Sequence, residues 1–526
     1  MRNRSFWRKA GVFFLSFLLT GSLFLTSNIP SARAGDNDGT LSQETTWKKR
    51  QLRALWVASV TNIDWPSAPG LSIGQQQQEF IQILNEAKEL NMNAVVVQIR
   101  PTADAFYPSK LNPWSKYLTG TQGKNPGYDP LDFMVREAHK RNLEFHAWFN
   151  PYRVSMDTET DQLAPNNVAR LHPDWVRSYG GKLYLDPGLP EVRAYIINSV
   201  MEVVNHYDID AVHFDDYFYP YPVSGIDFPD DPTYQKYGAD YPDKGDWRRH
   251  NVNLLVEQLS HAIKEAKPYV KFGISPFGIW RNQNTDPTGS DTNGLQSYDS
   301  IYCDTRTWIN EGWIDYVAPQ IYWNFGYAPA AYEKLVDWWA HEVNGKNVHL
   351  YIGQAAYKIG HSTEAWDDPE EMPNQLLFNN QFAEVKGSIF FSYKDVKANY
   401  LGFRDRLKND LFKYPALIPT MPWLDDNPPK KPKLLKAENK SGSAVHLVWK
   451  DQSKGDSTAF AIYRFSSAKE ISLNRPQNLI ATVRKNGNGL QTFDDRTAEN
   501  KPAIYVITAL DRLHNESKPS NPIFVR

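Results

Sequence analysis

The chain has 526 residues, more than one ordinary domain holds, and its formal net charge is −2. A chain without a basic surplus gives no indication of nucleic-acid binding. Aromatic residues make up 13% of the chain, and such rings serve either core packing or contacts with the apolar faces of sugar rings. The single cysteine, Cys303, allows no intramolecular disulfide, and we expect its thiol to be packed rather than reactive.

Residues 1–34 have the pattern of a signal peptide. The basic stretch MRNRSFWRK precedes the apolar run AGVFFLSFLLTGSLFLT, and SARA offers a cleavage site after Ala34. The apolar run is short for a membrane span, although an uncleaved anchor is the alternative. We therefore expect a secreted or cell-envelope protein with no stable membrane span after cleavage, and an N-terminal extension over 35–49.

From residue 50 to 413, short β-rich runs alternate with longer segments whose apolar residues recur at intervals of three and four. Eight β-then-α units predict a (β/α)₈ TIM barrel, an α/β fold. The alternative, a doubly wound sheet, is disfavoured because no Gly-rich phosphate turn follows the first run. The eight runs are LRALWVASV (52–60), AVVVQIRP (94–101), LEFHAWFNP (143–151), AVHFDDYFYP (211–220), KFGISPFG (271–278), YVAPQIYW (316–323), HLYIGQAAYK (349–358) and GSIFFSYKD (387–395).

The connections after the third and fourth runs are long, covering roughly residues 152–189 and 220–247. In a barrel such βα connections cap the C-terminal face, where active sites lie. The segment 414–433 is rich in proline and predicts a linker. Residues 434–526 contain short strand-like runs separated by turn residues, which predicts an all-β sandwich similar to a fibronectin type III module.

Polar residues gather at the C-terminal ends of the predicted barrel strands. Residues two apart share a face of a strand, so in five runs we expect polar side chains inside the barrel and apolar ones toward the helices. Those inward residues are Gln98 and Arg100; His146, Trp148 and Asn150; His213, Asp215 and Tyr217; Gln320 and Tyr322; Ser392 and Lys394. Arg100, Asn150 and Gln320 suit hydroxyl and carbonyl groups of a ligand, while Trp148, Tyr322 and Trp323 suit ring stacking, and Tyr217 and Tyr219 suit a cleft wall.

The sequence indicates neither a metal nor a cofactor. It has no HExxH motif and no Cys/His spacing for zinc, and NTDPTGSDTNG (284–294) lacks the spacing of an EF-hand loop. No Gly-x-Ser-x-Gly elbow indicates a serine hydrolase.

The remaining chemistry is that of carboxylates, and Asp215 and Asp216 stand at the end of the fourth strand. Glycoside cleavage needs an acid for the leaving oxygen and a group that stabilises the oxocarbenium-like state. Adjacent acids approach from one side, whereas the two-carboxylate scheme needs acids about 5–9.5 Å apart on opposite sides. Either another acid takes part, with Asp104, Asp304 and Asp395 as weak candidates, or the 2-acetamido oxygen of the substrate is the nucleophile.

In the acetamide scheme, similarity to barrel N-acetylhexosaminidases assigns Asp215 to orienting the acetamide and Asp216 to acid/base work. One point stays open at this stage. By strand alternation Asp216 shares the outward face with Val212 and Phe214, so it reaches the cleft only if the strand ends or twists there.

Several longer motifs carry a family resemblance over about residues 50–412: QIRPTADAFYPSKLNPWS, NPGYDPLDFMVREAHKRNLEFHAWFNPYRV, LDPGLPEVR, VHFDDYFYP, DWRRHNVN, GISPFGIWRN, DPTGSDT and YVAPQIYW. They resemble the bacterial glycosyl hydrolase-like 10 domain family of exported proteins. The resemblance implies a barrel glycosidase linked to cell-wall peptidoglycan, with peptide-free glycan strands as one substrate. The matching site positions are Arg100, Trp148, Asn150, Tyr152, Arg153, Asp215, Asp216, Tyr217, Tyr219, Trp280, Arg281, Gln320, Tyr322 and Trp323.

Two other functions remain open: a non-catalytic carbohydrate-binding barrel, and a glycosidase acting on another polysaccharide. The crowded aspartate pair favours an enzyme, because a binding protein has little need for two adjacent carboxylates.

Overall fold

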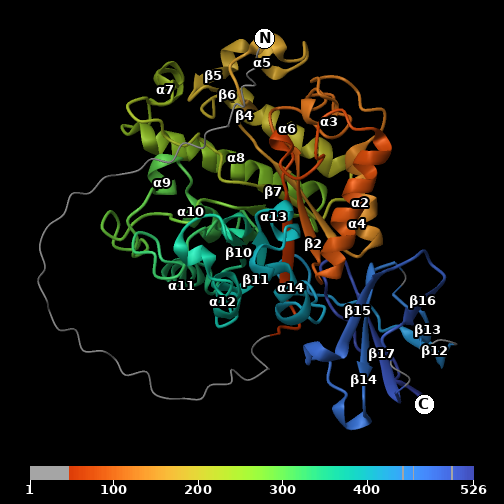
Figure 1. Cartoon of the computed structure of the whole chain (residues 1–526). Coiled ribbons are helices and arrows are strands. Elements are labelled where there is room, and N and C mark those ends of the chain that lie inside the picture. Colours follow the sequence, from red (N-terminus) through yellow and green to blue (C-terminus); the bar gives the residue numbers. More distant parts are fainter. Residues whose placement is uncertain (1–46, 441–443, 454, 499–500) are drawn as a thin grey trace, which may run out of the picture. The chain divides into compact units, whose positions relative to one another are not determined.

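The structure is a computed structural model that describes residues 47–440, 444–453, 455–498 and 501–526 (Figure 1). The predicted signal peptide and its cleavage site lie outside these residues. Across the described ranges, no helix has the length and apolar character needed to cross a membrane.

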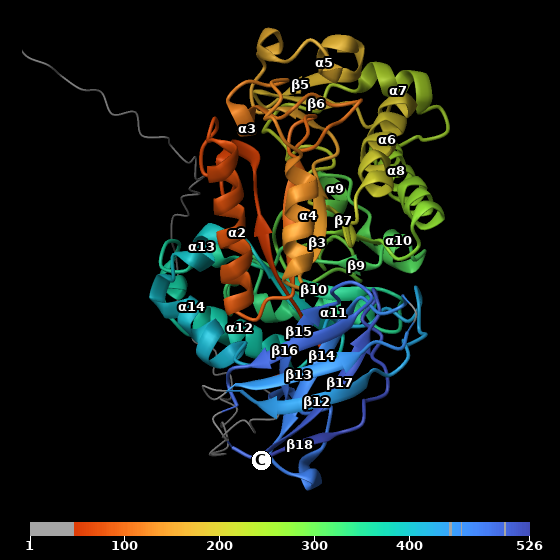
Figure 2. The ribbon, with the colours of Figure 1, turned by 90° about the vertical axis from the view of Figure 1, so that its right-hand side faces the viewer.

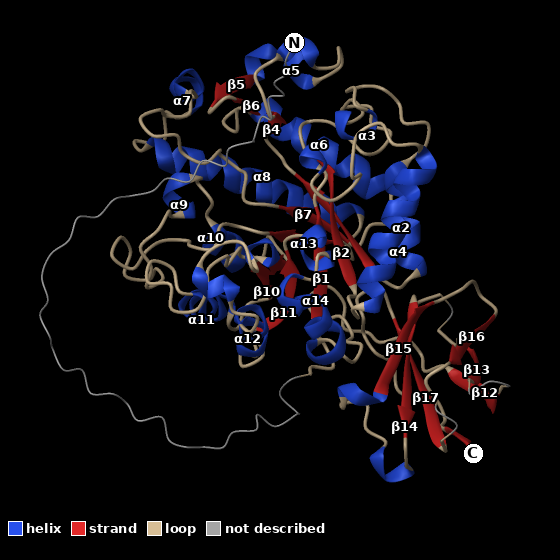
Figure 3. Ribbon diagram, viewed as in Figure 1, coloured by secondary structure: helices blue, strands red, loops and turns tan. Residues whose placement is uncertain are grey.

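Eight parallel strands close into a barrel, as the sequence predicts (Figures 1 and 3). Neighbouring strands follow the chain order, and the last strand pairs with the first, Leu52 opposite Gly387. The strands are β1 (Leu52–Val57), β2 (Ala94–Arg100), β3 (Glu144–Phe149), β7 (Ala211–Phe214), β8 (Lys271–Ile274), β9 (Tyr316–Val317), β10 (His349–Gln354) and β11 (Val385–Phe390). Each strand coincides with one predicted run, and most end several residues before the run does.

Helices cover the outside of the barrel, and their ends carry the expected capping residues. Ser72 and Gln75 form a capping box at the start of the first long helix, and Asp129 caps the next one ahead of Pro130. Figure 2 shows α2 and α4 running side by side, in agreement with their packing contacts. The longer helices are α2 (Ile73–Glu89), α4 (Pro130–Lys140), α6 (Pro190–His206), α8 (Lys244–Ala266), α11 (Tyr332–Val343) and α12 (Glu371–Asn379). Shorter ones are α3 (Lys116–Thr119), α5 (Val168–Leu171), α7 (Asp231–Tyr237), α9 (Ser297–Ser300), α10 (Thr305–Asn310), α13 (Tyr393–Lys397) and α14 (Phe403–Arg406).

The inward and outward faces follow the predicted alternation except at one place in β2. A register irregularity between Gln98 and Arg100 sets Arg100 opposite Phe149, an outward residue of β3. A bulge shifts the alternation by one residue, so the guanidinium leaves the barrel interior and lies 5.6 Å from the ring of Tyr195 on α6. The prediction that Arg100 faces the interior is therefore wrong.

The long connection after β3 contains a small antiparallel sheet of its own. It has the strand order β4 (Arg153–Ser155), β6 (Lys182–Leu185), β5 (Val176–Tyr179). Figures 1 and 2 both show this sheet with α5 beyond the carboxyl ends of β2 and β3. It thus lies at the end of the barrel where active sites are expected.

The C-terminal segment forms two antiparallel sheets with strand orders β12-β13-β16 and β15-β14-β17-β18. Trp449 of β13 and Tyr505 of β17 are buried in the core of this part. The likeness to a fibronectin type III module remains a prediction. The strands are β12 (Lys433–Asn439), β13 (Val445–Lys450), β14 (Ala459–Phe465), β15 (Leu479–Arg484), β16 (Leu490–Asp495), β17 (Ala503–Leu510) and β18 (Ile523–Val525).

The proline-rich segment 414–433 is packed rather than free where it leaves the barrel. Leu417 forms an isolated β-bridge with Arg50, and Ile418 and Met421 are buried in one cluster with Leu52 at the start of β1. This segment therefore lies against the N-terminal end of the barrel, away from the carboxyl ends of the strands.

Candidate active site

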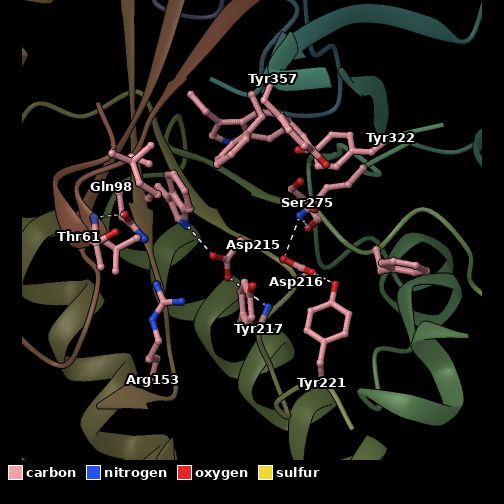
Figure 4. A pocket seen from close by; sticks show the side chains of 18 of the residues that line it. Thr61, Gln98, Arg153, Asp215, Asp216, Tyr217, Tyr221, Ser275, Tyr322 and Tyr357 are labelled. Carbon is pink, nitrogen blue, oxygen red and sulfur yellow. Dashed lines mark hydrogen bonds between the residues drawn. The ribbon is translucent and has the colours of Figure 1, made fainter. Parts of the chain in front are cut away.

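A cavity of about 510 Å³ lies at the carboxyl ends of the barrel strands (Figure 4). Eight of the predicted site residues line it: Trp148, Arg153, Asp215, Asp216, Tyr217, Gln320, Tyr322 and Trp323. They come from β3, β4, β7 and β9 or from the residues that directly follow these strands. The barrel thus gathers side chains that are up to 175 positions apart in the chain, from Trp148 to Trp323.

Asp215 and Asp216 both face this cavity (Figure 4). Strand β7 ends at Phe214, so the alternation that would turn Asp216 outward stops one residue before the pair. The two side chains are largely buried, with 6% and 4% of their surface exposed. The open question about Asp216 is therefore answered: the strand ends, and the second carboxylate turns in.

Three N–H donors hold the Asp215 carboxylate. The indole Nε1 of Trp148 donates to Oδ2 at 3.2 Å, Nδ2 of Asn150 donates to the same oxygen, and the backbone N–H of Tyr217 donates to Oδ1 at 3.2 Å. Asn150 is itself fixed, because its Oδ1 accepts from Nη2 of Arg153 at 2.9 Å. None of the three donors can accept a proton in return, so these hydrogen bonds fix the position of Asp215 and favour its charged form, against the burial that raises its pKa.

Asp216 has a different set of partners. The Tyr221 hydroxyl donates to Oδ2, and Nε2 of Gln320 donates to Oδ1 at 3.0 Å. Burial and the nearby carboxylates raise the pKa of Tyr221 well above its usual value, so this hydroxyl keeps its proton. A hydroxyl can donate to a carboxylate and accept from a carboxylic acid, so Asp216 has a suitable partner in both protonation states.

Burial raises the pKa of both aspartates. For Asp215 burial and the neighbouring Asp216 charge raise the pKa to about 7. For Asp216 burial raises the pKa, while the hydrogen bonds from Tyr221 and Gln320 oppose the rise. Two adjacent negative charges in a buried site repel each other, so ionising both aspartates costs free energy. The pair therefore holds one proton near neutral pH.

Asp215 and Asp216 are the only carboxylate residues that line the described cavity. The three weaker candidates lie elsewhere. Asp104 is fully buried and accepts from the backbone N–H of Thr102, Asp304 caps α10, and Asp395 closes a capping box at the start of α13. Within the described residues, no third acid thus stands across the cavity from the pair.

Aromatic side chains form much of the cavity wall. Tyr322 and Tyr357 face the aspartates from the side opposite Arg153 (Figure 4), and their ring centroids are 5.8 Å apart. Trp56 and Trp148 line the cavity beside Asp215. These rings offer the flat apolar surfaces that pyranose rings contact.

Two residues predicted to face the barrel interior as part of the site, Asn150 as a ligand contact and His213 as a substrate-binding residue, act from behind the cavity. Asn150 and His213 do not line it; Asn150 positions Asp215, and Nε2 of His213 accepts from the indole N–H of Trp56 at 3.2 Å. They are positioning residues, which touch groups of the cavity wall.

Five further predicted contacts do not line the cavity. Tyr152 and Tyr219 are each 1% exposed, and Tyr219 packs against Tyr302 with ring centroids 5.0 Å apart. Trp280 stacks on Trp338 at 6.0 Å, and Arg281 pairs with Asp299 at 2.8 Å. The bulge in β2 turns Arg100 out of the barrel interior, so its side chain does not line the cavity. Beyond a strand end the loop path decides where a side chain points, so motif membership and alternation do not place these residues.

The structure also brings in residues that were not predicted. Tyr221 holds Asp216, whereas the prediction chose Tyr219 from the same aromatic run. The aromatic run after Asp216 indicated a cleft wall, but the sequence does not show whether Tyr219 or Tyr221 contacts the aspartates. Other cavity residues without a sequence signal are Thr61, Met156, Lys182, Ser275, Phe277, Tyr357, Lys358 and Phe391.

Solved structures with a similar fold have low identity to this chain. The glycoside hydrolase domain of PgaB (BpsB) from Bordetella bronchiseptica matches with a TM-score of 0.43 and 14% identity, covering 68% of this chain and 98% of that one. The catalytic domain of a β-amylase from Paenibacillus polymyxa matches with a TM-score of 0.45 and 12% identity, over 70% of this chain and 99% of that one.

Sequence relatives are much closer. The glycosyl hydrolase YngK of Bacillus subtilis is 56% identical over 481 residues, which cover 90% of this chain and 92% of the relative. The glycosyl hydrolase DigH of Escherichia coli K12 is 42% identical over 388 residues, covering 69% and 88%. The model of the family called glycosyl hydrolase-like 10 matches residues 51–369. The chain belongs to the glycosyl hydrolase-like 10 family.

Proposed function

We propose that this glycoside hydrolase is exported and cleaves the N-acetylated glycan strands of bacterial cell walls after their stem peptides have been removed. The signal-like N-terminus supports export. The aromatic cavity at the carboxyl ends of the strands supports a glycan substrate.

The observation that carries the reaction type is the adjacency of Asp215 and Asp216. They alone supply carboxylates to the described cavity, and both follow directly on the end of strand β7. The two-carboxylate schemes require acids on opposite sides of the scissile bond. Substrate-assisted catalysis by a 2-acetamido group needs only neighbouring acids, and cell-wall glycans carry that group on their sugars.

In this mechanism Asp216 donates its proton to the leaving glycosidic oxygen while the acetamide oxygen attacks the anomeric carbon. The C–O bond to the leaving sugar breaks, and a cyclic oxazolinium ion forms. Asp216, now ionised and stabilised by Tyr221 and Gln320, then takes a proton from the water that opens the ring. The charged Asp215 accepts the acetamide N–H and stabilises the positive charge.

The substrate is tested by incubating intact sacculi with the mature protein, with and without amidase pretreatment. We expect soluble sugars only after the amidase has removed the peptides. Asp216→Asn, which keeps the shape of the side chain but cannot transfer a proton, should reduce this release at least about 100-fold. Cleavage of a plant or storage glycan but not of amidase-treated sacculi would contradict the proposed substrate.

The acetamide step has its own test. A thiazoline analogue of the cyclic intermediate should inhibit competitively and bind more tightly than the sugar product. Two successive displacements at the anomeric carbon also predict products of retained configuration, which NMR of the fresh products measures. Inverted products would exclude the mechanism without excluding the substrate.

A further inference from the structure

Three cationic side chains line the cavity together with the aspartate pair: Arg153, Lys182 and Lys358. Lys358 is engaged, because its ammonium donates to the backbone oxygen of Tyr322 and lies 5.8 Å from the ring of Trp366. Arg153 and Lys182 lie together on the small sheet of the β3–α6 connection. Neither Arg153 nor Lys182 transfers a proton in the proposed mechanism, so their positive charges are available to a ligand.

The small sheet places these two cations side by side. Arg153 on β4 pairs with Tyr184 on β6, and Lys182 lies two residues from Tyr184. Residues two apart share a face, so Lys182 is the diagonal neighbour of Arg153, within reach of one shared ligand. Burial, with the Arg153 charge as the second cause, lowers the pKa of Lys182. Their proximity therefore costs electrostatic energy that an anion between them would offset.

Both cations keep N–H donors that make no hydrogen bond within the described residues. Arg153 uses Nε for the Pro101 carbonyl at 3.0 Å and Nη2 for Asn150, which leaves Nη1. Among the ion pairs of the described residues, none involves the Lys182 ammonium or the Arg153 guanidinium, although the Arg153 charge acts on Asp215 and Asp216 from a greater distance. Arg153 is only 5% exposed, its charge lowers the pKa of both aspartates, against the burial that raises it, without forming an ion pair, and its guanidinium lies 5.2 Å from the ring of Tyr217.

The charge balance of the cavity favours an anionic ligand. Three cations face two carboxylates, and the carboxylate pair holds one proton near neutral pH. The cavity therefore carries a positive surplus although the whole chain has a net charge of −2. Figure 4 shows Arg153 on the opposite side of the aspartates from Tyr357, so an anionic group bound by Arg153 would lie on that side of the cavity.

We propose that Arg153 and Lys182 form a subsite that binds a carboxylate substituent on a sugar ring next to the cleaved bond. This inference rests on the proposed function, and it deepens it. A muramic acid residue whose stem peptide has been removed carries such a carboxylate, on the lactyl group, and the same residue with its peptide attached carries an amide there. The subsite would thus be the reason why peptide removal precedes cleavage.

The test compares two forms of one substrate: amidase-treated glycan strands, and the same strands with their carboxylates converted to neutral methylamides. The kcat/KM ratio of the first form to the second should be at least about 10 for the native protein, the scale of one or two charge-assisted hydrogen bonds. Lys182→Met should bring this ratio close to one, mainly through KM, and Lys182→Arg should restore most of it. Lys124→Met, an exposed lysine outside the cavity, is the matched control and should keep the native ratio.

A binding measurement keeps the inference separate from the proposed function. Asp216→Asn should turn over substrate at least about 100-fold more slowly, so its Kd for the two forms can be measured by calorimetry. Tighter binding of the carboxylate form with no cleavage by the native protein would support the subsite and overturn the proposed reaction. Cleavage of both forms with equal kcat/KM and equal Kd would overturn the subsite and leave the reaction intact.

Discussion

The indole N–H of Trp56 donates a hydrogen bond to Nε2 of His213 at 3.2 Å. An indole nitrogen can only donate, so His213 carries its ring proton on Nδ1, which lies 3.0 Å from the hydroxyl oxygen of Tyr316. Because the Tyr316 hydroxyl accepts from His213, it can donate its own proton to Nδ1 of His146, 3.1 Å away. Nε2 of His146 donates in turn to Glu144 at 2.9 Å. One consistent chain of donors thus runs through the barrel interior, from the cavity wall to Glu144.

This chain predicts the protonation of His213. Burial, with His146 as a second cause, lowers the pKa of His213 well below its usual value, so the ring is neutral at neutral pH. Nitrogen NMR of histidine-labelled protein should show His213 as the Nδ1–H tautomer from pH 5.5 to 8. The same label in urea-unfolded protein should titrate normally. An Nε2–H tautomer would contradict the direction of the chain.

Removal of the central hydroxyl should cost stability. Tyr316→Phe leaves Nδ1 of both His146 and His213 without a partner, and Tyr316 is fully buried. Each buried polar group left unsatisfied costs about 1–3 kcal/mol, so for two such groups we expect a loss of roughly 2–6 kcal/mol in urea denaturation. Tyr327→Phe, at a residue that is 41% exposed, should stay within about 0.5 kcal/mol of the native protein. Equal effects of the two substitutions would show that the chain contributes nothing.

Tyr221→Phe should move the acidic side of the pH–activity profile. The Tyr221 hydroxyl stabilises the charged form of Asp216 and opposes the rise of its pKa, so its removal raises that pKa further. The pair then takes up its second proton at a higher pH, and the acidic limb of kcat/KM should shift upward by about one pH unit. The measurement is kcat/KM on peptide-free glycan between pH 4 and 9. Tyr217→Phe is the control, because its hydroxyl donates to neither aspartate in the described structure; a limb that moves equally in both variants would argue against this role of Tyr221.

Strand alternation succeeded where the strands are regular and failed where they are not. It predicted inward positions for Trp148, His213 and Asp215, which lie on strands or one residue beyond them. It failed for Arg100, because a bulge has no signature in the residue types of β2. For Asp216, alternation alone could not decide whether the side chain faces the cavity or the helices, because the residue at which β7 ends depends on the loop that follows.

The loops limited the prediction of the site more than the barrel did. Tyr219 and Tyr221 are two residues apart in the same aromatic run, yet one packs into the protein and the other holds Asp216. Lys182 lines the cavity from strand β6 of the small sheet in the β3–α6 connection. The sequence of that strand, KLYL, gives no indication of a ligand contact. Such placements follow from tertiary packing, which a single sequence does not reveal.

Asp215→Asn should stabilise the fold at high pH while removing activity. In the folded state the pKa of Asp215 is about 7, above the value of about 4 expected for an unfolded chain. The folded state therefore binds this proton more tightly, and the native protein loses stability as the pH rises from about 4 to 7. Asparagine cannot ionise, so its advantage should grow by up to about 4 kcal/mol over that window, measured as urea-unfolding free energies at pH 4 and 8. Asp240→Asn, at an exposed carboxylate, controls for the loss of one charge; no growth of the difference with pH would contradict the raised pKa.

Gly273 of β8 makes room for Tyr316 inside the barrel. A Cβ atom at Gly273 would lie 2.1 Å from Cζ of Tyr316, too close for any packing without movement of the ring. Gly273→Ala should therefore displace the ring and break the donor chain, with a loss of about 3 kcal/mol or more in urea denaturation. Gly74→Ala, where a Cβ would meet nothing within 4 Å, should stay within about 1 kcal/mol of the native protein.

The cause of the Gly273 effect can be separated from a general loss of packing. Tyr316→Ser removes the ring that a Cβ at Gly273 would meet, and so it removes the clash as well as the hydroxyl's position in the chain. The double variant should then be less destabilised than the sum of the two single variants, because the second substitution relieves what the first one creates. Additive losses would mean that Gly273 and Tyr316 act independently, and the glycine would then be needed for the backbone of β8 rather than for the ring.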